Sequence, residues 1–205
     1  MSNYMVSNTR YSENLAIEIL KKLDIVAKSN NLNDITNVDL LAGDKNIRID
    51  VQYSQDFLKY GDLRIDFVSA YSIGYKNNFY HNHTIFQNFE SFYGFKVDKV
   101  GKYFQVDYLD AVIILFYNNK LIQDNSMPDK ILIIKRDDLL GYLNSNIPNI
   151  IKTLKLNHKE ELGDKHGSAF IPINIEQLVQ SASCYYGPIS FLISKKSDIK
   201  KYLNC

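Results

Sequence analysis

The sequence predicts an α/β (α+β) domain in which helices flank one central mixed sheet. Residues 12–23, SENLAIEILKKL, have apolar side chains at helical spacing, with Ser12 as the expected N-cap. Residues 110–117, DAVIILFY, and 130–135, KILIIK, are near-continuous apolar runs, which are typical of strands covered on both faces of a sheet. Helices, strands and a mixed region alternate along the chain, and this order favours a mixed sheet.

The remaining elements follow from turn residues and periodicity. We expect a strand over Thr36 to Leu41, a turn at Gly43 and a paired strand from Ile47 to Tyr53. Residues 75–95 are rich in aromatic residues and have no clear period. The other expected elements are a strand at 62–71, a helix starting at 136–143, a strand at 169–173, a helix at 174–182 and a strand at 189–194.

Composition excludes several classes of protein. Lys and Arg total 24 against 23 Asp and Glu, so the net charge of +1 gives no overall attraction to polyanions or to an anionic membrane. Two cysteines, Cys184 and Cys205, are too few for a disulfide framework or a cysteine-rich zinc site. No apolar run reaches the length of a membrane span, and the first residues lack the pattern of a signal peptide. We therefore expect a cytoplasmic protein with a flexible tail at 1–11 and a single domain at 12–205.

Two aspartates are expected to meet on the hairpin around Gly43. Alternate residues of a strand share a face, so Asp50 and Gln52 project together. Asp39 reaches the same end of the sheet if the hairpin folds about Gly43. Two carboxylates a few ångströms apart repel each other unless a divalent cation lies between them. Hard oxygen ligands favour Mg²⁺ first and Mn²⁺ second, and such a site typically serves phosphodiester hydrolysis.

These residues resemble a known family. Asp39, ten intervening residues and then Asp50-Val51-Gln52, on a hairpin after a helix that contains ENLAIEIL (13–20), are similar to the PD-(D/E)XK nuclease superfamily of restriction endonucleases and Holliday-junction resolvases. The resemblance covers residues 12–54, and residues 110–117 are a candidate for the later core strand of the family. It implies a restriction-endonuclease-like fold.

The resemblance also implies a role for each residue of the motif. Asp39 and Asp50 would be metal ligands, and the carbonyl of Val51 would complete the shell. Gln52 would take the place of the lysine that positions the attacking water, and Glu13 would be the acidic residue of the first helix, with Glu18 as a weaker alternative. The expected protein is a Mg²⁺-dependent (or Mn²⁺-dependent) endonuclease that cuts double-stranded DNA as a homodimer, either a restriction-type enzyme or a nuclease of a phage or mobile element.

The sequence departs from the family pattern at the same residues. Val38 stands where the family pattern has a proline. Asp50 is the less common of the two acids, Asp and Glu, that the pattern allows at its position. Gln52 replaces a charged lysine with a neutral amide. Lys59 or Arg64 could supply the missing positive charge. The competing hypothesis is a catalytically inactive protein with the nuclease fold that binds DNA or another protein.

A second acidic group is the runner-up for the metal site. Asp62, Arg64 and Asp66 alternate on one face of the strand expected at 62–71. Their spacing after Asp50 gives another Asp…Asp-x-Arg pattern. The alternative interpretation is a cross-strand ion-pair ladder on an exposed face, which we favour because such pairs are common and weak.

Overall fold

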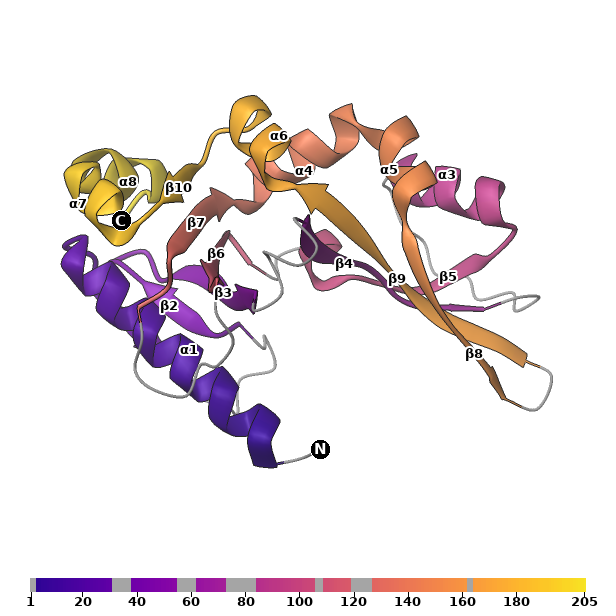
Figure 1. Ribbon diagram of the computed structural model, residues 1–205, viewed down its shortest axis with the longest axis horizontal. Coiled ribbons are helices and arrows are strands. Elements are labelled where there is room, and N and C mark those ends of the chain that lie inside the picture. Colours follow the sequence, from indigo (N-terminus) through magenta and orange to yellow (C-terminus); the bar gives the residue numbers. More distant parts are fainter. Residues whose placement is uncertain are drawn as a thin grey trace. The chain divides into compact units, whose positions relative to one another are not determined.

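The computed structural model describes residues 3–30, 38–54, 62–72, 84–105, 109–118, 127–161 and 164–205. It confirms the expected mixture of helices and strands, including a mixed sheet (Figure 1). The residues cluster into two compact units, where the sequence indicated a single domain. Unit 1 comprises 1–61, 107–138 and 183–205, and unit 2 comprises 62–106 and 139–182. The chain therefore passes between the units four times. None of these crossings has the Pro- or Gly-rich linker sequence that would indicate a domain boundary.

Unit 1 contains a six-stranded sheet in the order β1-β2-β3-β6-β7-β10. Neighbouring strands are antiparallel except for β3 and β6, which are parallel. β6 is buried along its whole length, as its uninterrupted apolar sequence predicts. The strands are β1 (Ala27–Ser29), β2 (Leu40–Ala42), β3 (Ile47–Ser54), β6 (Ala111–Phe116), β7 (Lys130–Lys135) and β10 (Tyr185–Gly187).

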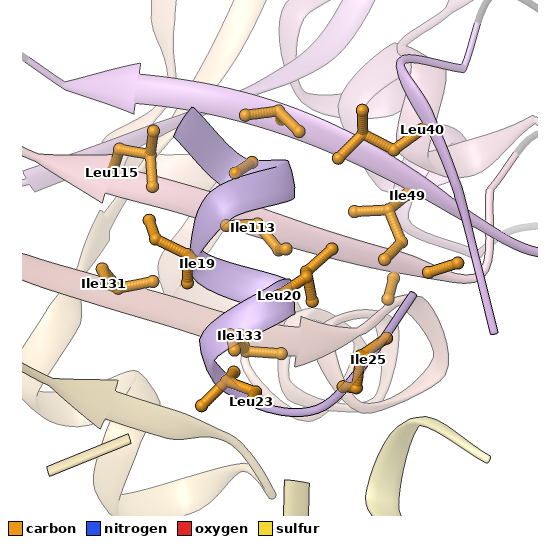
Figure 2. Close-up of a cluster of buried hydrophobic side chains, with 14 of the residues drawn as sticks. Ile19, Leu20, Leu23, Ile25, Leu40, Ile49, Ile113, Leu115, Ile131 and Ile133 are labelled. Atoms are coloured by element: carbon orange, nitrogen blue, oxygen red, sulfur yellow. The ribbon is translucent and has the colours of Figure 1, made fainter. Parts of the chain in front are cut away.

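Helix α1 (Asn3–Lys22) packs against one face of this sheet. Ile19 and Leu20 of α1 are fully buried against strand residues such as Ile49 and Ile113 (Figure 2). The expected N-cap at Ser12 is wrong: Ser12 is a buried residue inside the helix. The helix begins earlier because the preceding residues, expected as a tail, contain no Gly or Pro to stop it.

Two C-terminal helices, α7 (Ile189–Ser194) and α8 (Lys196–Leu203), complete the same core. Leu192, Ile199 and Leu203 are buried in the cluster that contains the apolar residues of α1. The strand expected at 189–194 is therefore wrong, because Pro188 starts a helix whose amide groups at 191 and 192 bond back to its carbonyl. β-branched and aromatic residues predicted a strand, and tertiary packing of Leu192 overrides that preference.

Unit 2 contains a four-stranded antiparallel sheet in the order β5-β4-β9-β8. A register shift between Asp66 and Val68 marks a bulge in β4. The strands are β4 (Asp62–Ser72), β5 (Lys96–Val100), β8 (Lys155–Glu161) and β9 (Asp164–Asn174), and the helices are α3 (Thr84–Tyr93), the 3₁₀ helix η1 (Lys102–Phe104), α5 (Ile147–Thr153) and α6 (Ile175–Ser181). α4 (Arg136–Ser145) starts in unit 1 and continues into unit 2.

The core of unit 2 is aromatic. Phe67 of β4 stacks on Phe86 of α3 with ring centroids 4.8 Å apart, and Phe89 and Phe104 meet Phe67 edge-on at 5.5 Å. These geometries are favourable for aromatic pairs. α3 lies within the aromatic segment at 75–95 that sequence periodicity left unassigned, of which residues 75–83 are outside the described residues.

Among the helices that the structure describes, none is both long enough and apolar enough to span a lipid bilayer.

Candidate metal site

The β2–β3 hairpin brings Asp39 next to Asp50. The strands are antiparallel with Leu40 opposite Ile49, and the same register continued by one residue sets Asp39, which directly precedes β2, opposite Asp50. The turn between the strands uses Gly43 and Asn46, which both have positive φ angles of 65° and 51°. Glycine adopts this conformation without steric cost. The hairpin predicted about Gly43 is confirmed.

The carboxylate of Asp39 is held against the main chain of β3. Its Oδ2 accepts a hydrogen bond from the N–H of Val51 at 2.7 Å. The carbonyl of Asp39 accepts from the N–H of Asn30 at 2.9 Å. Because the N–H and C=O of one strand residue point toward the same neighbouring strand, the carbonyl of Val51 also faces the side of Asp39. The two oxygen atoms predicted as metal ligands, from the carboxylate of Asp39 and the carbonyl of Val51, therefore lie on the same side of β3.

Asp50 has only 2% of its surface exposed. Among the residues whose exposure the structure describes, it is the only charged residue that is buried. Burial of an ionised carboxylate is costly unless charge or hydrogen bonds compensate it, so such a residue marks a functional position or a structural polar contact. Asp50 faces away from α1, because its neighbours Ile49 and Val51 project into the α1 core.

Gln52 shares the face of Asp50 and is half-buried. Its side chain therefore lies one strand repeat beyond the buried carboxylate, as the alternation of β3 predicts. Val38, which takes the place of the proline of the family pattern, is buried at 4% exposure. Lys59, the residue considered as a substitute positive charge, lies outside the described residues.

Glu13 lies on the α1 side of the sheet. Its Oε2 accepts a hydrogen bond from the hydroxyl of Ser29 at 3.2 Å. Ser29 is opposite Leu40, whose side chain belongs to the core beneath α1. Within the described parts of the chain, no three Asp, Glu, His or Cys side chains come close enough together to hold a metal ion. Glu13 is therefore not joined to Asp39 and Asp50 as a third ligand, and Glu18 is exposed on α1.

The donor set around Asp39 still suits a hard divalent cation. Two carboxylates and a main-chain carbonyl are oxygen ligands of the kind that Mg²⁺ and Mn²⁺ prefer. Mg²⁺ is commonly bound by one or two carboxylates and completes its shell with water and substrate oxygens. The residues thus fit the expected ion by their chemistry, and Asp39, Asp50 and the Val51 carbonyl would be its protein ligands.

The runner-up group lies on β4 in unit 2. The guanidinium of the exposed Arg64 lies 5.0 Å from the ring centroid of Phe170, which is a cation–π distance. Oδ2 of Asp66 accepts a hydrogen bond from the hydroxyl of Ser69 at 2.7 Å. Both side chains therefore have local structural contacts, which supports the structural interpretation of this group.

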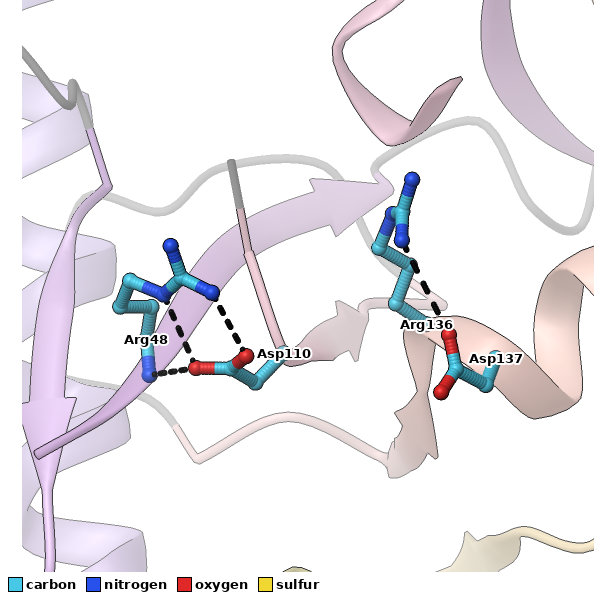
Figure 3. A network of polar contacts seen from close by, with 4 residues as sticks. All are labelled: Arg48, Asp110, Arg136 and Asp137. Atoms are coloured by element: carbon cyan, nitrogen blue, oxygen red, sulfur yellow. Dashed lines mark hydrogen bonds and ion pairs between the residues drawn. The ribbon is translucent and has the colours of Figure 1, made fainter. Parts of the chain in front are cut away.

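An ion pair that the sequence did not reveal lies at the start of β3 and β6. Nε and Nη2 of Arg48 donate to the two carboxylate oxygens of Asp110 at 3.0 and 2.8 Å, and the main-chain N–H of Arg48 donates to Oδ2 at 2.8 Å (Figure 3). Hydrogen bonding from Arg48 is the main cause that lowers the pKa of Asp110, and the charge of Arg136 contributes. Only the parallel pairing of β3 with β6 brings these residues together, so a single sequence carries no direct signal for them.

A cavity of 320 Å³ opens beside this ion pair. Every residue that lines it belongs to unit 1. Charged side chains contributed by β3, β7, α4 and the segments before β6 surround it, together with apolar residues. The lining residues are Ile47, Arg48, Leu109, Asp110, Ala111, Lys135, Arg136, Asp137, Leu203 and Asn204.

Comparisons of the chain with protein-family models, with curated proteins and with solved structures found no match.

Proposed function

We propose that this chain is a Mg²⁺-dependent endonuclease that hydrolyses DNA, with Asp39, Asp50 and the carbonyl of Val51 as metal ligands. The observation that carries the proposal is the buried Asp50 at the register position opposite Asp39. A divalent cation bound between the two carboxylates would balance the charge of both. The cation would supply a more acidic bound water and neutralise charge on the phosphate.

The chain's own residues hold the site in place. The N–H of Val51 fixes the orientation of the Asp39 carboxylate at 2.7 Å. β3 is a central strand with β2 on one side and β6 on the other, so the backbone that carries Asp50 is rigidly positioned. Gln52 would orient the attacking water by a hydrogen bond, because its amide can donate or accept but carries no charge.

The order of elements also supports the proposal. The hairpin with Asp39 and Asp50 follows the helix that contains residues 13–20. The segment at 110–117, suggested by the sequence as the later core strand of the nuclease family, forms β6 and lies beside β3. The two segments that the sequence resemblance connects, the hairpin and residues 110–117, thus belong to one sheet. The proposed enzyme acts as a homodimer, because cutting both strands of a duplex with one site per chain requires two copies.

A second candidate is a protein of the same fold that binds DNA or another protein without cleaving it. The position of Glu13 favours this candidate, since it contacts Ser29 and forms no group of three acidic side chains with the two aspartates in the described structure. The neutral Gln52 also favours the non-catalytic candidate, because an amide stabilises a hydroxide less than an ammonium group does.

Calorimetric titration with Mg²⁺ and Mn²⁺, together with a plasmid-nicking assay, separates the two candidates. The enzyme should bind either metal and nick the plasmid, and Asp50→Asn should lose both properties while the protein stays folded. Without metal, Asp50→Asn should melt at a higher temperature, because repulsion between the carboxylates is removed. The matched control is Asp44→Asn, which changes an exposed aspartate in the turn of the same hairpin and should leave both properties intact.

Wild-type protein that neither binds the metals nor cleaves DNA or RNA would instead support the binding module. Normal cleavage by a folded Asp50→Asn protein would contradict the assignment of this residue as a ligand.

A further inference from the structure

The cavity at the start of β3 and β6 has a surplus of positive charge. Three cationic residues, Arg48, Lys135 and Arg136, line it together with two carboxylates. Asp110 pairs with Arg48 at 2.8 Å, and Asp137 pairs with Arg136 at 3.8 Å (Figure 3). The side chain of Asp137 is 93% exposed, so solvent screens its charge. The side chain of Arg136 is only 16% exposed, so its charge acts in a less polar environment. The five charged side chains thus carry a net charge of +1, which favours an anion over a cation.

The cationic groups of the cavity are held before any ligand binds. Asp110 holds the guanidinium of Arg48 through two side-chain hydrogen bonds, and its carbonyl accepts the main-chain N–H of Arg136 at 2.9 Å. The guanidinium of Arg136 lies 3.8 Å from the carboxylate of Asp137. The ammonium of Lys135 lies 5.1 Å from the ring centroid of Tyr202. Arg136 is also the first residue of α4, a ten-residue helix, whose N-terminal amide groups add partial positive charge. Groups fixed in this way lose little conformational entropy when an anion binds.

One residue that lines the cavity, Arg48, lies on the same strand as the proposed metal ligand Asp50. Arg48 precedes Asp50 by two residues on β3, so the two side chains project from the same face. Two strand residues cover about 7 Å. This separation is comparable to the spacing of neighbouring phosphates along a nucleic-acid strand.

We propose that this cavity binds the backbone phosphate next to the phosphate that is cleaved at Asp39 and Asp50. The inference rests on the proposed nuclease function and adds a substrate-binding subsite to it. Arg136 and Arg48 are the phosphate-binding residues, and Asp110 is a positioning residue that orients Arg48. A phosphate contact fixes the register of the DNA strand relative to the metal site without reading its sequence.

The test measures DNA binding in the Asp50→Asn background, in which cleavage does not interfere. Fluorescence anisotropy with a labelled duplex, repeated from 50 to 200 mM salt, gives the dependence of affinity on salt. Loss of one phosphate contact lowers the slope of log K against log salt by about 0.9. Arg136→Gln should therefore show a three- to fourfold smaller loss of affinity over this range, as that slope predicts. Arg136→Lys should restore the slope, because it keeps the charge.

The matched control is Lys201→Gln, which removes one positive charge from an exposed position of α8 in the same unit. Its slope should equal that of the Asp50→Asn parent. Melting curves of all variants show that each is folded, and Arg48→Gln repeats the measurement at a second cavity residue.

Equal slopes for Arg136→Gln and its parent would overturn the subsite while leaving the nuclease proposal to its own cleavage assay. If inorganic phosphate alone raises the melting temperature of the parent but not of Arg136→Gln, and the DNA slopes are equal, the cavity binds small anions and the inference is wrong. If the Asp50→Asn parent binds no DNA at all, the subsite is also wrong. The nuclease proposal is then judged separately, by whether the wild-type protein nicks the plasmid when metal is added.

Discussion

The acidic residues of the β2–β3 hairpin and those of β4 have similar sequence patterns but different surroundings. Asp50 is buried beside Asp39, whose carboxylate accepts a main-chain hydrogen bond from a neighbouring strand. On β4, Arg64 is exposed and lies over Phe170, and Asp66 bonds to Ser69 three residues along the same segment. Charged residues in similar sequence patterns can thus form a buried polar site or a set of local surface contacts.

The position of each strand in its sheet explains this difference. β3 pairs in parallel with β6, a strand buried along its whole length, so β3 is part of a sheet region that is covered on both faces. β4 belongs to an antiparallel sheet in which Leu63 and Ile65 are buried while Arg64 between them is exposed. One face of β4 at this point therefore meets solvent, and charges there cost little to maintain.

The largest expected effect compares Asp39 with Asp66. Asp39→Asn should reduce metal-dependent nicking on the order of a thousandfold, because a ligand charge at the metal is lost. Its side-chain oxygen can still accept the N–H of Val51, so the fold should remain. Asp66→Asn likewise keeps an acceptor for Ser69 and should change nicking less than twofold, within the range of surface substitutions. If Asp66→Asn lost nicking activity while Asp39→Asn kept it, the active site would be on β4 and not on the β2–β3 hairpin.

A smaller effect separates Gln52 from Arg64. Gln52→Ala should lower the cleavage rate on the order of ten- to a thousandfold, the range for one positioned hydrogen bond. Gln52→Lys should retain or partly restore activity, since an ammonium group can occupy the water-positioning place. Cleavage by the wild type should be faster with Mn²⁺ than with Mg²⁺, because the metal must supply most of the acidification of water.

Arg64→Ala is the control on β4 and should leave the cleavage rate unchanged. It should reduce stability by about 0.5–1 kcal/mol through loss of the contact with Phe170. If Gln52→Ala had no effect and Arg64→Ala removed activity, the runner-up group would be the catalytic one. If neither change affected cleavage, the assignment of Gln52 would be wrong.

The smallest effect is the pH dependence of the Arg48–Asp110 ion pair. Arg48 holds the pKa of Asp110 below its usual value of 3.8 in the folded state. The pair therefore stabilises the fold above that unfolded-state pKa, and the contribution is lost as the pH falls through the lower folded-state pKa. Arg48→Gln should reduce stability at pH 7 by up to about 1 kcal/mol, since Asp110 is partly exposed.

Thermal or denaturant unfolding between pH 7 and pH 2 measures this difference, which should shrink at the acid end. Lys96→Gln is the comparison in unit 2, where Lys96 pairs with Glu90 at 3.0 Å and is 56% exposed. Its effect at pH 7 should be smaller, because screening weakens exposed pairs. A difference between wild type and Arg48→Gln that stays constant down to pH 2 would mean that Arg48 stabilises the protein by packing rather than by its charge.

Local sequence patterns determined many elements of this protein. The alternation of 47–53 predicted β3, the apolar runs predicted β6 and β7, and Asn174 begins α6 as an N-cap that accepts hydrogen bonds from residues 176 and 177. The shared face of Asp50 and Gln52 also followed from the strand period. The strand predictions succeeded because periodicity and apolar runs depend on residues that are close together in the chain.

Only the tertiary structure decided which distant segments meet. The parallel pairing of β3 with β6 unites Arg48 with Asp110 and forms the cavity, although the two residues are far apart in sequence. The burial of Leu192 made a helix of residues that favour a strand, and repeated crossing of the chain between two units hid their boundary. Such contacts depend on the packing free energy of whole surfaces, which no local window of sequence contains.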